Sequence, residues 1–69
     1  MKSYYFSMRN RNGSVEEDLG WLTFSDESEA VNHARRVIAD LVRDGAREYA
    51  GWTLDVLEND RVIAAIKIV

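Results

Sequence analysis

The only histidine, His33, is the side chain best suited to acid–base chemistry near neutral pH. Glu29 precedes it by four residues, a helical spacing at which the two side chains can pair. A general base also needs a nucleophile and an orienting group, whereas a metal site needs three or four converging ligands. The sequence designates neither set. We therefore expect His33 to occupy a surface or boundary position, and we predict no catalytic, metal-binding or cofactor-binding residue.

Carboxylates gather in a second place, the run Glu16-Glu17-Asp18, with Asp26 and Glu27 further along the chain. The run lacks the alternating oxygen ligands and the central glycine of a calcium-binding loop. Paired carboxylates also hydrolyse glycosides, but that chemistry needs a deep cleft, which a chain of 69 residues rarely provides. A solvated strand edge is the preferred interpretation, while cation binding by the run stays an open alternative.

The basic side chains are mostly arginines, seven Arg against two Lys, and arginine favours bidentate contacts. A candidate basic surface consists of Arg9, Arg11, Arg36, Arg43 and Arg47. Asp40, Asp44 and Glu48 are interleaved with the helical arginines at spacings of three and four, which favours ion pairs within the helix. The net charge of −3 disfavours binding to nucleic acid or to an anionic membrane, because both need a positive field.

The elements that position these groups follow from the periodicity of the apolar residues. Alternation predicts a strand from Ser3 to Arg9, with Tyr4, Phe6 and Met8 on one face and Tyr5 on the other. Asn12-Gly13 predicts a hairpin turn into a short, irregular edge strand over 15–24, where Gly20 interrupts the ladder or marks a bulge. Alternation returns at 52–57, and 62–69 is a β-branched, almost wholly apolar run, which together predict two more strands around a turn at 58–61.

A helix over 27–44 is predicted by apolar residues at spacings of three and four. Asp26 can cap its first turn, and Glu29 three residues later completes a capping box. Gly45 can adopt the left-handed conformation that ends a helix.

These elements predict one α+β domain over residues 1–69, with β-β-α-β-β order and a single helix packed on a four-stranded sheet. The second and third strands carry the acidic residues Glu16, Glu17, Asp18, Asp55 and Glu58, and charged strands belong at sheet edges. The favoured strand order is therefore 2-1-4-3, as in β-grasp folds, with an all-antiparallel order as the alternative. Without cysteine, the fold must be held by packing alone.

The apolar residues, 46% of the chain, exceed what one helix can cover. The face of the sheet opposite the helix is predicted to carry the candidate interface residues Tyr5, Leu57, Ile63, Ala65 and Val69. Contiguous exposed apolar surface marks an interface, so we expect self-association or binding of another protein. Coverage of this face by the long side chains of Arg9 and Lys67 is the alternative interpretation.

Several short motifs carry a family resemblance: Tyr4-Tyr5-Phe6, Glu17 to Gly20 with acid-x-x-Gly spacing, Asp26 with Ala30 and Ala34, Gly51-Trp52-x-Leu54-x-Val56, and Arg61-Val62. The chain resembles a family of small uncharacterised bacterial proteins, mostly from rhizobia and relatives, known as domain-of-unknown-function family 6894. It departs from the family's Leu-Pro-Asp at Phe24-Ser25-Asp26 and from its Asp-Gly at Asn59-Asp60. The resemblance implies a bacterial, cytoplasmic setting and supplies no catalytic residue.

The sequence therefore predicts a cytoplasmic, non-enzymatic protein-interaction module or homodimer without a cofactor. A nucleic-acid-associated or antitoxin-like regulator is the alternative, based on analogy with other small hairpin–helix–hairpin domains. No apolar run reaches the length of a membrane span, so no membrane partner is expected.

Overall fold

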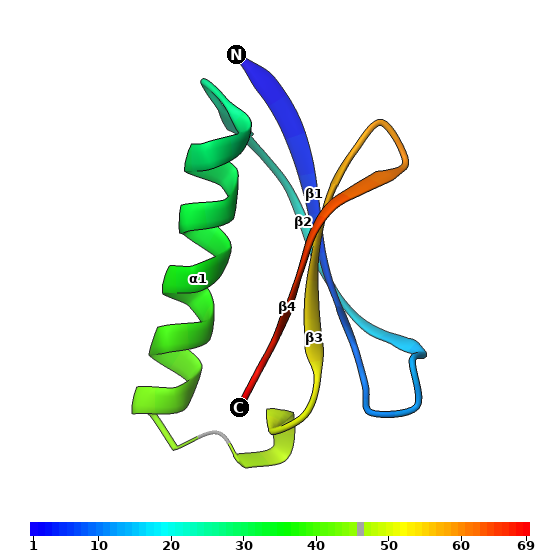
Figure 1. The fold of residues 1–69 in the computed structure, drawn as a ribbon, viewed down its shortest axis with the longest axis vertical. Helices are drawn as coiled ribbons and strands as arrows, with labels where there is room; N and C mark the ends of the chain where they lie inside the picture. The colour runs from blue at the N-terminus through cyan, green and yellow to red at the C-terminus, as the bar shows by residue number, and fades with distance from the viewer. Residues whose placement is uncertain (46) are drawn as a thin grey trace.

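A computed structural model describes residues 1–45 and 47–69, and it contains one long helix and a four-stranded sheet. In chain order the elements are β1 (Lys2–Arg9), β2 (Val15–Phe24), α1 (Glu27–Arg43), the 3₁₀ helix η1 (Arg47–Tyr49), β3 (Thr53–Glu58) and β4 (Arg61–Lys67). Helix α1 lies along one side of the sheet, and none of the described elements covers the other side (Figure 1). The predicted two-layer α+β architecture is confirmed.

The sheet has the order β2-β1-β3-β4, and every pair of neighbours is antiparallel. This is the all-antiparallel alternative, and the favoured order 2-1-4-3 is wrong because β1 pairs with β3. The prediction placed β3 at an edge because it carries Asp55 and Glu58. In the structure Arg9 of β1 donates to Asp55 through Nε at 2.6 Å and Nη2 at 3.0 Å, so this carboxylate has a partner inside the sheet. A central position for β3 is then compatible with its charge.

Edge strand β2 contains an irregularity at Gly20. Phe6 pairs with Gly20 and Ser7 with Asp18, so Leu19 is an extra residue. Gly20 has φ +86°, a left-handed conformation that favours glycine, and its N–H donates to the Asp18 carboxylate at 2.9 Å. The edge position and the interruption at Gly20 were predicted correctly. The strand is not short, however, because it runs for ten residues.

Helix α1 begins as the sequence predicts and ends one residue earlier. The Asp26 side chain accepts a hydrogen bond from the Glu29 N–H at 3.0 Å. The Glu29 carboxylate accepts in return from the N–H of Ser25 at 3.0 Å and from its hydroxyl, so the reciprocal partner lies one residue before the cap. Gly45, with φ +73°, donates to the carbonyl of Val42 at 3.1 Å beyond the end of the helix.

The hydrophobic core lies between α1 and the two central strands. It consists of buried side chains from the helix, the sheet and the segment after β4: Tyr4, Phe6, Met8, Ala30, Ala34, Ile38, Leu54, Val56 and Ile68. Because two of the three helical residues are alanines, the helix can approach the sheet closely. The core side chains of β1 and β3 occupy alternate positions along each strand, so the residues between them in sequence point to the opposite face.

The turn between β3 and β4 has the backbone that its residue types predict. Asn59 and Asp60 have φ values of +51° and +65°, both in the left-handed region. Two consecutive left-handed residues form the tight turn that matches the twist of a hairpin. The turn places Asp60 beside the end of the uncovered face.

Candidate functional site

A row of four apolar side chains crosses the uncovered face of the sheet. Trp21 of β2 pairs with Tyr5 of β1, Tyr5 pairs with Leu57 of β3, and Leu57 pairs with Val62 of β4. Directly paired residues point to the same face, so these four side chains are neighbours across all four strands. Trp21 is 61% exposed and Val62 is 53% exposed. We call Trp21, Tyr5, Leu57 and Val62 the apolar row.

The aromatic half of the apolar row borders a shallow hollow. The rings of Tyr5 and Trp21 lie 5.1 Å apart at an interplanar angle of 54°, a tilted arrangement that aromatic pairs favour. Together with Leu57 and Asp60 they line a hollow of about 240 Å³. A hydrogen bond to the Asp18 carboxylate, followed by partial burial, raises the pKa of the Tyr5 phenol. The hollow has the size and the apolar walls to receive an aliphatic side chain.

Two polar rows follow the apolar row along the strands. The first contains Asp18, Ser7, Asp55 and Ala65, and the second contains Val15, Arg9, Thr53 and Lys67. Arg9 lies over Asp55, and the hydrogen bonds to that carboxylate raise the pKa of the guanidinium. Asp55 is consequently only 5% exposed, although no helix covers it. The uncovered face is therefore polar and internally paired in its middle and apolar at one end.

The structure places three of the five candidate interface residues on the uncovered face. Tyr5 and Leu57 belong to the apolar row, and Ala65 pairs with Asp55 in the first polar row. Ile63 lies elsewhere, because the register shift between Val56 and Leu57 makes it an extra residue in β4. Such a bulge exchanges the faces of the residues around it, so Ile63 packs against the core and Val62 takes its place beside Leu57.

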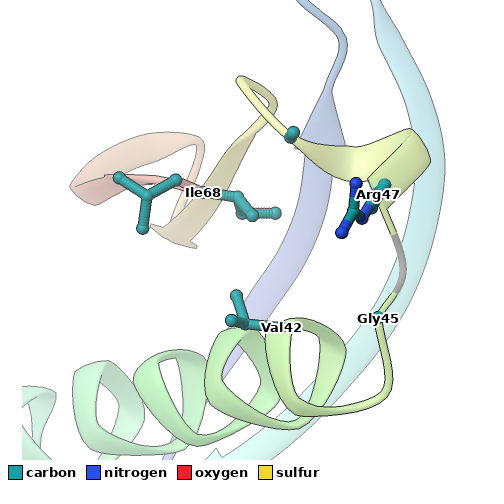
Figure 2. A pocket seen from close by; sticks show the side chains of 6 residues that line it. Val42, Gly45, Arg47 and Ile68 are labelled. Carbon is teal, nitrogen blue, oxygen red and sulfur yellow. The ribbon is translucent and has the colours of Figure 1, made fainter.

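Val69, the fifth candidate, lies near the end of the helix and away from the apolar row. It lines a hollow of about 250 Å³ with Val42, Arg47 and Ile68. Figure 2 shows Val42 pointing from the last turn of α1 toward Ile68, with Arg47 at the side of the opening. Val42 is 51% exposed, so this is a second, smaller apolar area.

Sequence reasoning missed Trp21 and Val62 as members of the site. The position of Trp21 could have been predicted from the sequence. A bulge at Gly20 leaves residues 21–24 as a regular strand opposite β1, in which successive side chains alternate between the two faces of the sheet. Val62 points to the uncovered face only because of the bulge in β4. The sequence contains no glycine or other residue there that would predict this bulge.

Two of the five candidate basic residues are paired with carboxylates. Arg9 binds Asp55, and Arg43 donates to Asp40 at 2.6 Å on the exposed side of α1. The latter pair has the spacing of three that the sequence predicts for ion pairs within the helix, and its partners are both exposed.

The other three basic candidates lie at separate places. Arg11 donates from Nε to the carbonyl of Ala50 at 2.8 Å and ties the β1–β2 turn to the segment before β3. Arg36 lies on α1 beside His33, whereas Arg47 borders the hollow in Figure 2. The structure does not bring the five arginines together into one surface.

His33 has a boundary position, half-buried between two aromatic rings. Its ring lies 5.3 Å from that of Phe6 and 5.3 Å from that of Phe24. It also lines an apolar hollow of about 210 Å³ between α1 and β2, beside Leu19, Leu22 and Val37. Glu29 borders a further hollow with His33, and its carboxylate accepts hydrogen bonds from Ser25.

The acidic residues at the start of β2 point in different directions and have different partners. Glu16 accepts from the Asn10 amide at 2.9 Å, and Glu17 accepts from the Tyr49 hydroxyl at 2.6 Å on the helix side. Asp18 lies on the uncovered face and accepts from Gly20. Within residues 1–45 and 47–69, no three His, Cys, Asp or Glu side chains are placed to hold a metal ion. Nor does any helix in these ranges have the length and apolar character needed to cross a membrane.

Comparison with known protein families gives a match over residues 3–68 to the model of a domain of unknown function (DUF6894). The match includes every strand pair and the helix described above except for the first residue of β1. Searches of curated proteins and of solved structures gave no match.

Proposed function

We propose a function for this chain from its own surface, because it belongs to DUF6894, a family whose description names no activity. The chain is a non-enzymatic protein-interaction module that self-associates through the uncovered face of its sheet. The observation that supports this proposal is the apolar row, which crosses all four strands opposite α1.

The apolar row favours a binding surface over the alternative, which is a set of exposed apolar residues without a function. Isolated exposed apolar side chains are ordinary on protein surfaces, but contiguous ones at a sheet face usually mark an interface. Trp21 and Tyr5 are residue types that are enriched in interfaces, and they pack against each other at one end of the row. A large aromatic side chain at 61% exposure gains considerable free energy from burial against a partner.

A second copy of the chain is the partner that best fits this face. Two antiparallel sheets can stack face to face about 10 Å apart, with their inner side chains interdigitating. Strand addition at the edges is a weaker route, because β2 and β4 both contain register shifts. Bulges at edge strands hinder edge-to-edge pairing.

Sedimentation equilibrium over a micromolar-to-millimolar concentration range tests the proposal. We expect the mass to rise from that of a 7.9-kDa monomer to that of a dimer within this range. A monomer mass at every concentration would overturn the proposal of self-association.

A further inference from the structure

We propose that the second copy docks with its two-fold axis parallel to the strands, so that β2 of each copy lies over β4 of the other. The inference rests on the proposed function and adds the orientation of the partner. Two charge patterns and the order of residues in the apolar row distinguish this orientation from the reverse one, in which the axis runs across the strands.

The two edges of the sheet carry opposite charges. On the uncovered face, edge strand β2 carries the acidic Asp18 and edge strand β4 carries the basic Lys67 in the neighbouring row. An axis parallel to the strands exchanges the two edges, so the acidic strand of one copy lies over the basic strand of the other. Complementary charges at an interface favour the correct orientation and disfavour others.

An axis across the strands places each strand over the same strand of the partner. Asp18 on the uncovered face would then lie near Asp18 of the partner subunit, because both belong to the middle row of the face. Two carboxylates facing each other at an interface repel one another. With the axis parallel to the strands, Asp18 instead lies over the partner's Ala65.

When the axis is parallel to the strands, the apolar row of one copy lies over the apolar row of the other, with the order of the residues reversed. Trp21 then faces the partner's Val62, and Tyr5 faces the partner's Leu57. The hollow beside Tyr5 and Trp21 lies where the partner's Leu57 would project, and its volume of about 240 Å³ accommodates an aliphatic side chain. An axis across the strands would place the apolar row over the row that contains Arg9 and Lys67, which leaves apolar side chains against charged ones.

Cross-linking from position 67 can distinguish the two orientations, because Lys67 faces a different residue of the partner in each of them. With the axis parallel to the strands it faces the partner's Val15, and with the axis across the strands it faces the partner's Val62. Both valines are exposed, at 65% and 53%, and both lie on the uncovered face. The chain contains no cysteine, so single cysteines can be introduced without side reactions.

The experiment mixes purified single-cysteine variants and treats them with a bis-maleimide reagent that spans about 10 Å, the separation of stacked sheets. We expect Lys67→Cys mixed with Val15→Cys to give several-fold more cross-linked heterodimer than Lys67→Cys mixed with Val62→Cys. Each variant alone serves as the background. Because shortening Val62 itself weakens association, both mixtures are cross-linked at a concentration at which sedimentation shows each of them to be fully dimeric.

The outcomes separate the two proposals. Dominant cross-linking of Lys67→Cys with Val62→Cys would overturn the orientation and leave self-association through this face intact. Dimer mass without cross-linking in either mixture would overturn the orientation and the choice of this face. Monomer mass for the unmodified chain would overturn the proposed function itself, and the orientation with it.

Discussion

Truncation of Val62 should weaken self-association, whereas truncation of a matched valine on the helix should not. Val62→Ala removes two methyl groups from the end of the apolar row at a position that is 53% exposed. Val42→Ala removes the same groups from the last turn of α1, where the side chain is 51% exposed. The two substitutions have equal chemistry and nearly equal exposure, so only their location distinguishes them.

The expected magnitude follows from the area that each valine still exposes. Burial of two methyl groups is worth about 1.6 kcal/mol at about 0.8 kcal/mol for each carbon. About half of the Val62 side chain is already buried in the isolated chain, so association gains about 0.8 kcal/mol per copy. A two-fold dimer contains two copies of the contact, and the loss is about 1.6 kcal/mol, or roughly 15-fold in the dissociation constant.

Sedimentation equilibrium of the three proteins measures this difference directly, and circular dichroism establishes that each variant retains its fold. We expect a dimer dissociation constant roughly 15-fold higher for Val62→Ala and unchanged for Val42→Ala. Equal weakening by both substitutions would refute the assignment of the interface to the uncovered face. A larger effect of Val42→Ala would place the interface at the hollow beside Val69 instead.

The remaining predictions concern stability. Asp26→Ala removes the acceptor for the Glu29 N–H and should lower the free energy of unfolding in urea by about 1 kcal/mol, while Asp44→Ala, beyond the end of the same helix, serves as a comparison expected to change less. Gly20→Ala should cost about 1 kcal/mol because the residue has φ +86°, and since no atom lies within 4 Å of the added Cβ, a much larger loss would contradict a purely conformational cause. Burial raises the pKa of Tyr4 above its ordinary value of 10.0, and hydrogen bonds to Asp18 and Glu17 raise the pKa values of Tyr5 and Tyr49. A raised tyrosine pKa stabilises the fold below pH 10.0, and this contribution is lost as the pH rises through the raised values, so the urea midpoint should fall above pH 10.0 together with the appearance of phenolate absorbance. A midpoint that stays constant through the tyrosine titration would contradict these shifts.

Local signals predicted the elements well, but they did not predict how the strands pair. The capping residue Asp26, the left-handed Asn59-Asp60 turn and the bulge at Gly20 are each set by residues within a few positions of them. Strand order depends on partners distant in sequence. Asp55 considered alone indicated an edge strand, where solvent can reach its carboxylate. Because Asp55 pairs with Arg9, 46 residues away, its strand can instead lie inside the sheet.

The candidate site could be predicted only in part for a similar reason. Strict alternation identified Tyr5 and Leu57, whose strands pair in regular register. The bulge in β4 exchanged Ile63 for Val62, and a shift of one residue cannot be inferred from alternation when both residues are β-branched and apolar. Trp21 was not among the candidate interface residues, and its pairing with Tyr5 places it on the uncovered face.

The two tryptophans provide the most direct measurement of the central claim, because one belongs to the apolar row and the other does not. Trp21 lies beside Tyr5 on the uncovered face, while Trp52 packs against Tyr49 with ring centroids 5.0 Å apart and contacts the core. Their indole N–H signals can be followed by NMR as the protein is diluted. Self-association through the uncovered face predicts that the Trp21 signal shifts with concentration and that the Trp52 signal stays fixed. A Trp21 signal that does not move over a range in which the protein dimerises would contradict the account.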